Sequence, residues 1–314
     1  MSIAVPLYGF GASGGGTGGT LTVTAPANVT VTVSKDGKTK TKNSGTSGVV
    51  VFKGLASGTW TVTITGDGKT AQKNVVVTTD YSTAISFNTI PEFTYTGDYE
   101  IVNDSDEPIT VSQDNWKIRF LTSGTLTFTN LNGAEGGIDV FLVGGGGDGG
   151  TRNWNPDSSV YQHGAGGGGG YTKTQKNIPV AVGTEYSITI GSNTGTTKAF
   201  NLSASGGANA YGEAKGWEKG GSGGSGGGAT SKPGGTNGGN GIAHEYATGG
   251  TGQGTTTKEF GEENGRLYAS GGNGNKTEST APNSGNGADG RTTDDTSTSK
   301  NPGASGIVVI RNKR

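Results

Sequence analysis

The chain has 314 residues, enough for two or three domains, and only 29% of them are hydrophobic. Its 24 basic residues nearly balance 25 acidic ones, so a nucleic-acid partner is not expected. The lack of cysteine excludes disulfides, zinc–thiolate sites and thiol nucleophiles. No stretch approaches 18 apolar residues, and residues 1–10 lack the basic start and apolar length of a signal peptide. We therefore expect no membrane insertion, and synthesis in a cytoplasm.

The N-terminal part predicts an attachment arm followed by a small β-sandwich. Residues 1–19 end in GASGGGTGG, which is a flexible composition. Residues 20–88 alternate between apolar and polar side chains without a helical period. Asp36-Gly37 and Asp67-Gly68 each separate two alternating runs, which is a common hairpin signal. We therefore predict an antiparallel, Ig-like sandwich over residues 20–88.

The remainder predicts a connector over 89–100 and a glycine-rich β domain over 101–314. No segment of ten or more residues carries the apolar stripe of a helix. The predicted fold class is therefore all-β. Strands are expected at residues 116–121, 124–129, 138–143, 171–177, 186–190 and 199–204.

Glycine is concentrated in this second part, where residues 144–306 hold 45 of the 64 glycines. The composition allows two interpretations, a disordered spacer or a solid of packed glycine helices. The flanking segments IDVFLV (138–143) and GIVVIR (306–311) read as buried strands, and aromatic residues interrupt the glycine runs, whereas flexible linkers have neither feature. We therefore predict packed polyglycine II helices whose backbone groups bond to one another. The runs lie at 144–150, 164–170, 220–228 and 234–241.

The loops between the runs are the candidate binding site. If successive runs alternate in direction, loops 151–163, 213–219, 242–248 and 275–284 lie together at the end far from the sheet. Exposed aromatic rings on a rigid support are typical of binding surfaces. The candidate receptor-binding residues are Trp154, Tyr161, His163, Trp217, His244 and Tyr246. Their alternative role is structural, in which the rings pack as small apolar cores that cover the ends of the glycine layer. The same alternation places loops 229–233 and 255–268, with Lys232, Phe260 and Tyr268, at the sheet end.

Signals for chemistry are weak. Residues 66–70 (GDGKT) resemble the tail of a phosphate-binding loop but have Thr63 where the motif needs glycine, and a strand rather than a helix is expected there. The G-x-S-x-G matches at residues 11–15, 220–224 and 223–227 lie in glycine-rich runs with no helix expected after them, so they are not nucleophile elbows, and no H-E-x-x-H motif accompanies the two histidines. We therefore predict no catalytic residue, metal or cofactor. A glycan-cleaving enzyme stays an alternative, with Glu213, Glu218 and Glu245 as the carboxylates that such a reaction needs.

Two segments carry family resemblances. Residues 52–64 (FKGLASGTWTVTI) resemble a hairpin of carboxypeptidase-regulatory-like and related Ig-like repeat domains, which implies a spacer or attachment module. The C-terminal two thirds are similar to glycine-rich tail proteins of phages and prophages of Gram-positive bacteria. This second resemblance rests on WKIRFLTSGTLTF (116–128), IDVFLVGGGG (138–147), GQGTTTKEFGE (252–262) and GIVVIR (306–311). It implies a virion structural protein at the tail tip or fibre.

The glycine layout is also similar, at the level of architecture, to tail-fibre adhesins in which a polyglycine sandwich presents receptor-binding loops. The resemblances together imply a non-enzymatic tail adhesin, attached to other virion tail proteins through residues 1–88 and contacting a host-surface glycan or protein. Assembly into a homo-oligomer is left open. The alternatives are a structural tail or capsid decoration protein without receptor contact, and an ice-binding protein, for which regular threonine ladders would be expected.

Overall fold

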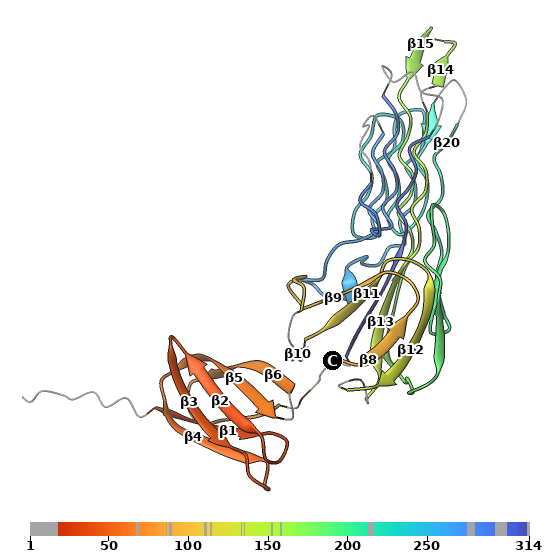
Figure 1. Cartoon of the computed structure of the whole chain (residues 1–314). Helices are drawn as coiled ribbons and strands as arrows, with labels where there is room; N and C mark the ends of the chain where they lie inside the picture. Colours follow the sequence, from red (N-terminus) through yellow and green to blue (C-terminus); the bar gives the residue numbers. More distant parts are fainter. Residues whose placement is uncertain are drawn as a thin grey trace, which may run out of the picture. The chain divides into compact units, whose positions relative to one another are not determined.

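The structure is a computed structural model in which the chain forms two compact units, residues 1–88 and 89–314 (Figure 1). It describes residues 18–66, 69–85, 87, 90–109, 112–113, 115–132, 134, 136–151, 153–157, 159–212, 217–274, 280–292 and 300–312. Most of the predicted arm, the Asp67-Gly68 turn, Glu213 and parts of loops 213–219 and 275–284 lie outside these residues. Within the described residues the architecture is all-β, as predicted, with one short 3-10 helix.

The N-terminal unit consists of two sheets around one apolar core. One sheet has the strand order β4-β1-β7, and the other contains β6-β5-β2-β3. Alternate residues of both sheets, among them Val23, Phe52, Val31 and Val62, are buried in the shared cluster. The strands are β1 (Gly19–Thr24), β2 (Thr30–Lys35), β3 (Lys38–Asn43), β4 (Val49–Leu55), β5 (Gly58–Gly66), β6 (Lys69–Val77) and β7 (Tyr81–Ala84).

The predicted Asp36-Gly37 hairpin is confirmed. Strands β2 and β3 pair antiparallel up to Lys35 and Lys38, which leaves a two-residue loop. Asp36 and Gly37 have φ values of 50° and 75°, the left-handed pair that a two-residue hairpin turn requires.

The C-terminal unit contains a five-stranded sheet, β16-β13-β22-β11-β9, and a three-stranded sheet, β17-β12-β8. Three further pairs, β14–β15, β18–β19 and β20–β21, are small hairpins. The strands are β8 (Glu92–Tyr95), β9 (Tyr99–Val102), β10 (Ser112–Gln113), β11 (Lys117–Phe120), β12 (Gly124–Asn130), β13 (Ile138–Val143), β14 (Asn153–Asn155), β15 (Val160–Gln162), β16 (Thr172–Ile178), β17 (Glu185–Ile188), β18 (Thr197–Ala199), β19 (Leu202–Ala204), β20 (Tyr211–Gly212), β21 (Glu218–Lys219) and β22 (Ile307–Asn312).

The three central strands of this sheet, β13, β22 and β11, are buried on both faces, as the apolar sequences of β13 and β22 predicted. On one face Ile118, Val140 and Ile310 pack in the same cluster as Leu126 and Phe128 of the three-stranded sheet. On the other face Phe141 and Val309 pack with Phe260 and Tyr268 of the loop over residues 255–268, which includes the 3-10 helix η2 (Glu259–Gly261). The loop thus acts as a lid on the sheet, and the prediction that Phe260 and Tyr268 lie at the sheet end is confirmed.

One strand prediction is wrong. Residues 199–204 do not form a single strand, because the chain reverses between β18 and β19. Phe200 and Asn201, the two residues between the strands, have φ values of 49° and 61°. Asparagine tolerates this left-handed region of backbone conformation, but phenylalanine rarely occupies it. Only one of the two residues is therefore typical of a turn.

The glycine-rich segments are inserted between two neighbouring strands of one sheet. Strand β13 pairs antiparallel with β22, from Ile138 opposite Asn312 to Val143 opposite Ile307. The chain leaves this sheet at Gly144, returns to it once in strand β16 (Thr172–Ile178), and enters β22 after Gly306 (Figure 1). We call the intervening hydrogen-bonded segments the glycine layer. They are residues 144–150, 164–170, 206–210, 220–228, 234–241, 249–254, 269–274, 285–291 and 301–306.

Backbone hydrogen bonds in the glycine layer recur at every third residue. Gly144, Gly147 and Gly150 donate their amides to the carbonyl groups of Tyr171, Gly168 and Ala165 (2.9, 2.8 and 2.8 Å). Gly164, Gly167 and Gly170 donate to Arg291, Ala288 and Gly285 (2.8, 2.8 and 2.7 Å). The amides of the residues in between bond to a different segment, since Gly146 and Gly149 donate to the carbonyl groups of Ala304 and Asn301. One segment therefore bonds to several neighbours in turn.

These segments approach one another too closely for side chains. A Cβ atom built on Gly147 would lie 2.0 Å from the carbonyl oxygen of Ala208, and one on Gly167 would lie 2.2 Å from that of Gly147. The obstructing atoms belong to the backbone and cannot rotate away. Glycine is therefore required at these positions by contact rather than by dihedral angle.

Two glycine runs fold back on themselves, which the alternation argument did not anticipate. On the way out, the amides of Gly221 and Gly224 donate to the carbonyl groups of Gly166 and Gly169. On the way back, the carbonyl groups of Ser225 and Gly228 accept from the amides of Gly169 and Gly166. Residues 220–228 therefore run along the same neighbouring segment in both directions. The run at 234–241 reverses likewise, since Gly235 donates to Gly226 and Gly226 donates to Gly239. As a consequence loop 229–233 lies at the far end, where the amides of Thr230 and Gly274 bond to Glu218 and Lys232. The prediction that placed Lys232 at the sheet end is wrong.

Candidate functional site

We call four of the connections at the end of the glycine layer far from the sheet the distal loops. They are residues 151–163, 211–219, 229–233 and 242–248. Figure 1 shows β14, β15 and β20 at this end. All six predicted receptor-binding residues belong to these loops.

Trp154 and Tyr161 form one aromatic pair. They lie opposite each other on the antiparallel strands β14 and β15. Their rings meet edge to face, with centroids 5.2 Å apart and planes at 70°. Both stay largely accessible, with 50% of Trp154 and 44% of Tyr161 exposed. The hairpin therefore orients two rings without burying them, which is the arrangement a contact surface needs.

Trp217, His244 and Tyr246 form a second aromatic group from two different loops. The His244 ring stacks on Trp217, with centroids 4.2 Å apart and planes at 24°. Tyr246 lies 5.3 Å from Trp217 and 6.0 Å from His244 between ring centroids. Tyr246 is 60% exposed. Residues 217 and 244–246 are distant in sequence, so only the layer beneath them brings them together.

A tight turn fixes His244 in this group. The backbone amide and carbonyl of His244 pair with those of Ala247 (2.7 and 3.3 Å). The Tyr246 amide donates to Nδ1 of His244 (3.3 Å). Partial burial, and then the charge of Lys232, lowers the pKa of His244, while Glu245 acts in the opposite direction. The neutral imidazole is therefore favoured, with Nδ1 as an acceptor.

Apolar side chains are exposed at this end to an unusual degree. Among the described residues, six of the thirteen exposed large hydrophobic side chains belong to the distal loops, namely Trp154, Val160, Tyr161, Tyr211, Ile242 and Tyr246. Sequence reasoning missed Tyr211, which is 51% exposed and lies 5.4 Å from the Lys219 ammonium. Its position at the end of a glycine-containing segment was the available signal.

Glu218 anchors the distal loops to the glycine layer. It is only 4% exposed. Its Oε2 accepts a hydrogen bond from the Ala165 amide (2.8 Å), and its carboxylate occupies the space beside Gly150 that a Cβ atom would need. Its own amide donates to Thr230 Oγ1 (2.8 Å). One carboxylate thus holds together segments that support both aromatic groups. Glu245, by contrast, is exposed.

His163, the remaining predicted residue, lies one residue before the run that begins at Gly164 and is partly buried. It therefore belongs to the base of the β14–β15 hairpin rather than to its outer end.

A cluster of buried charges at the sheet end was not predicted. Lys117 Nζ lies 2.7 Å from Asp106 Oδ1 and 2.9 Å from Glu259 Oε1, and Arg119 contacts the same two carboxylates. Tyr268 also donates to Glu259 Oε2 (3.0 Å). Burial, and then the Glu259 charge, raises the pKa of Tyr268. These contacts tie the lid loop to strand β11.

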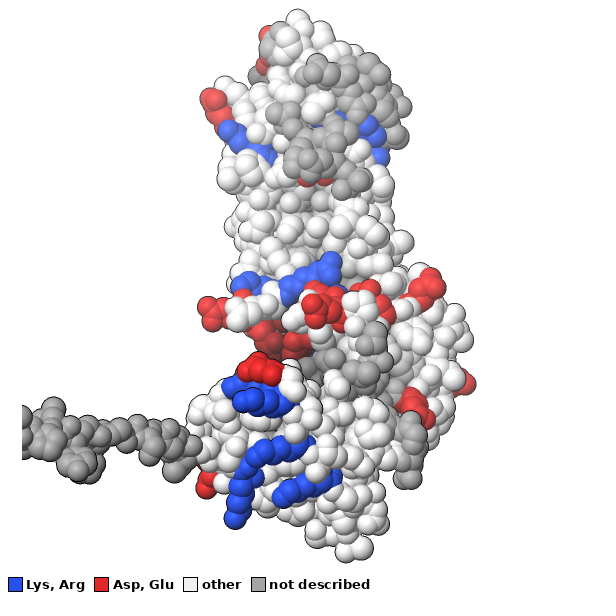
Figure 2. All heavy atoms as spheres, turned by 60° about the vertical axis from the view of Figure 1, so that its left-hand side comes forward, with Lys and Arg blue, Asp and Glu red and all other residues white. Residues whose placement is uncertain are grey.

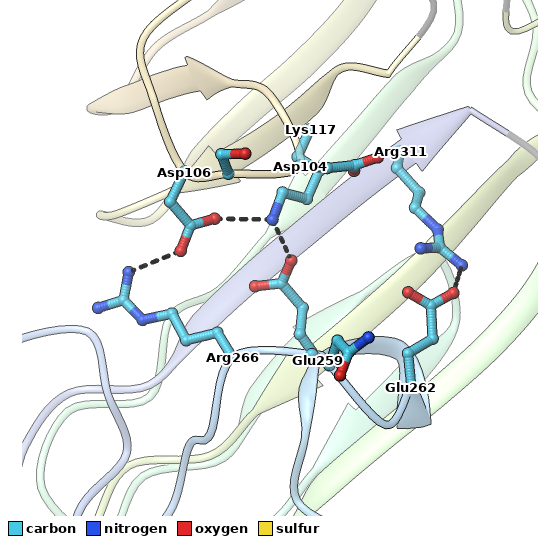
Figure 3. Close-up of a pocket in the computed structure, with 10 residues that line it drawn as sticks. Asp104, Asp106, Lys117, Glu259, Glu262, Arg266 and Arg311 are labelled. Carbon is cyan, nitrogen blue, oxygen red and sulfur yellow. Dashed lines mark hydrogen bonds and ion pairs between the residues drawn. The ribbon is translucent and has the colours of Figure 1, made fainter. Parts of the chain in front are cut away.

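The same cluster lines a cavity of about 390 Å³ (Figure 3). Its charged groups face one another, and Arg311 Nη2 pairs with Glu262 Oε1 at 2.6 Å. Partial burial alone would raise the pKa of Asp106, but the hydrogen bond from Lys117 and the charge of Arg119 outweigh it and lower that pKa. The arrangement is that of a structural ion-pair network.

Figure 2 shows, on the side in view, a stretch of surface without charged side chains between the distal end and the charged side chains nearer the sheets. Among the described residues no group of three or more histidine, aspartate or glutamate side chains is arranged to hold a metal ion. The described part of the chain also contains no helix long and apolar enough to cross a membrane.

A family model described as a glycine-rich domain matches residues 121–313. This match covers the glycine layer and strands β12 to β22 of the sheet framework, but not β8, β9 or β11. No curated protein matches the chain.

Proposed function

The chain belongs to the glycine-rich domain family over residues 121–313, and from that premise we propose that it is a phage tail protein that binds the host surface through its distal loops. In this proposal it is a non-enzymatic component of the tail fibre or tip, made in the host cytoplasm. The resemblance of residues 116–128 and 252–262 to tail proteins supports the virion role. The geometry of the distal loops supports the binding role.

The proposal includes a rigid support, the packed polyglycine II helix. This helix has three residues per turn and no internal hydrogen bonds, so its amides must bond to neighbouring chains. The bonds from Gly144, Gly147 and Gly150 to one neighbouring run follow that three-residue period. Such a layer can carry loops of different sequence, because the loops contribute little to its packing.

The observation that carries the binding role is the exposure of six large hydrophobic side chains at one end of the layer. Exposed apolar clusters on soluble proteins commonly mark interaction sites. Tryptophan and tyrosine dominate such sites, because they offer a large contact area for little loss of side-chain freedom. A host glycan could stack on these rings, and a host protein could enclose them. Residues 1–88 then serve to attach the chain to other tail proteins.

Binding of purified full-length protein to cells of the infected bacterium tests the proposal. We expect the combined variant W154A/Y161A/W217A/Y246A to bind at least about tenfold more weakly, since truncated aromatic anchors each cost about 2 kcal/mol or more. The control is Y81A, because Tyr81 is 45% exposed on the N-terminal unit, much like Tyr161. Equal binding by both variants would refute the proposal. It would favour the alternative of a tail or capsid decoration protein, whose loop variants should assemble and infect normally.

A further inference from the structure

The sheet formed by β6, β5, β2 and β3 in the N-terminal unit has an outer face without charge. Residues that are directly opposite in antiparallel strands share a face, so the pairing register defines this face without ambiguity. Thr32 lies opposite Thr41 and Thr63, and Thr63 lies opposite Gln72. The rows on either side follow the same pattern. We call this surface the threonine face. It consists of Thr30, Thr32, Ser34, Thr39, Thr41, Asn43, Thr61, Thr63, Thr65, Thr70, Gln72 and Asn74. Thr59 and Val76, which is 57% exposed, extend the same outer side of the sheet beyond this face.

Charge is abundant in these strands but is placed on the other face. Residues 18–88 contain seven lysines and three aspartates, a net charge of +4. Five of the lysines, namely Lys35, Lys38, Lys40, Lys42 and Lys73, occupy inner-face positions on β2, β3 and β6. Lys42 and Lys40 pair with the core residues Val31 and Val33, and Lys73 pairs with Val62. Lysine normally points outward from a sheet, so this segregation runs against the ordinary pattern.

The inward lysines reach the edge of the other sheet instead of lying on the outer face. Lys40 Nζ donates to the Lys53 carbonyl (2.6 Å), Lys42 Nζ to that of Val51 (2.7 Å) and Lys73 Nζ to that of Ala84 (3.1 Å). Inward charges at edge strands protect a sheet from pairing with other strands. That explains their placement at the edges, but it leaves the absence of charge from all four outer strand faces unexplained.

The threonine face is rich in groups that both donate and accept hydrogen bonds. Its hydroxyl and amide side chains are exposed or partly exposed. Two cross-strand pairs hold one another, Thr32 Oγ1 with Thr41 Oγ1 (3.0 Å) and Thr61 Oγ1 with Asn74 Oδ1 (2.9 Å). Threonine is restricted in χ1, so the face is ordered before any partner arrives. These hydroxyl and amide groups complement an uncharged, hydroxylated partner, and the face lacks the positive charge that would attract a polyanion.

Size and shape narrow the choice of partner. With strands about 4.8 Å apart and alternate residues about 6.7 Å apart, the face covers roughly 300–400 Å². A stable protein dimer buries about 800 Å² per partner, so a second copy does not fit. A flat crystal such as ice does not fit either, because strands rotate by about 20–25° each and so twist a four-stranded sheet by about 60–75°. We propose that the threonine face binds a neutral polysaccharide chain lying across the four strands, a function beyond that of the distal loops.

Co-sedimentation of the full-length protein with insoluble cellulose, chitin and β-1,3-glucan tests this proposal. We expect retention on at least one of these polymers, and a loss of about tenfold or more in the T32K/T63K variant, because a buried ammonium without a partner is costly. The T32V/T63V variant removes the hydroxyl groups but keeps the shape, and it should also lose retention. The matched control is T22K, a charge on the partly buried Thr22 of the opposite sheet, which should bind like the unaltered protein.

Three results would overturn the assignment. The first is no retention of the unaltered protein on any of the three polymers. The second is retention that T32K/T63K leaves unchanged or that T22K reduces equally. The third is a different occupant, shown by a concentration-dependent dimer or by inhibition of ice recrystallisation that T32V/T63V abolishes. The W154A/Y161A/W217A/Y246A variant should keep its polysaccharide retention, so failure of the distal-loop proposal stays distinguishable from failure of this one.

Discussion

Replacing Gly167 by alanine tests whether the glycine layer is a packed solid. The new Cβ would lie 2.2 Å from the Gly147 carbonyl oxygen and 2.6 Å from that of Asp148. Gly167 also donates to Ala288 and accepts from Gly272 (2.8 Å each). Relieving the clash requires one run to move away from its neighbours, which strains these bonds.

The expected loss in free energy of unfolding follows from these contacts. Overpacking costs about 1–3 kcal/mol, and each of two weakened backbone hydrogen bonds contributes about 0.5–1.5 kcal/mol. We therefore expect G167A to destabilise the C-terminal unit by about 2–6 kcal/mol. For a unit of this size the unfolding midpoint Tm should fall by about 4 °C or more. In a flexible linker the same substitution would leave Tm unchanged, because the residue would be disordered in both the folded and the unfolded state.

Differential scanning calorimetry of the full chain measures this change. The matched control is G239A, since Gly239 lies in a glycine run but its Cβ would meet only Thr236, with the nearest atom at 3.0 Å. Its Tm should change by a few degrees at most. A Tm for G167A equal to or above that of the unaltered protein would refute the packing argument, because only a packed layer predicts a loss of stability.

The charged cluster gives two further predictions. Glu259 is 2% exposed and neutralises Lys117 and Arg119, so E259Q should destabilise the C-terminal unit by about 3–5 kcal/mol. The control E262Q changes a carboxylate that is 48% exposed, and it should alter the free energy of unfolding by about 1 kcal/mol or less. Equal effects of the two variants in urea titrations would contradict the ion-pair network. The pKa of Asp106 is lowered by folding, so its contribution to stability is present above the unfolded pKa of about 3.9 and is lost as the pH falls through the folded value. Tm should therefore decline as the pH drops below about 4 and decline less steeply in D106N, and parallel Tm curves for the two proteins would refute this role.

The sequence predicted local features of the fold better than the path of the chain. Strands β13 and β22 and the Asp36-Gly37 turn carry strong local signals, namely β-branched runs and a dipeptide that favours left-handed backbone. The reversal at Phe200-Asn201 carries a weak signal and was missed. The reversal inside residues 220–228 leaves no signal, because neighbouring glycines look alike whether the chain continues or turns. The reversal inside residues 234–241 occurs at Asn237-Gly238, with φ values of 49° and 82°, a turn dipeptide that the assumed alternation overlooked. These two reversals cancel, so the position of loop 242–248 was predicted correctly although that of loop 229–233 was not.

The candidate site shows the same division. Aromatic residues between glycine runs identified Trp154 and Tyr246 as candidates, but the stacking of His244 on Trp217 depends on contacts between distant segments. The buried charges at Lys117, Arg119 and Glu259 come from strand β11 and the lid loop, and no local pattern connects them. The threonine face became visible only when the register of four strands was known.

Hydrogen exchange of the backbone amides in residues 144–150 and 164–170, measured on the full chain, tests the central claim most directly. Amides bonded to neighbouring runs exchange only when the layer opens, so we expect protection comparable to that of β13 and β22. Exchange at the rate of an unstructured chain throughout these two runs would show that they do not form a layer, and the common support for the distal loops would then be absent.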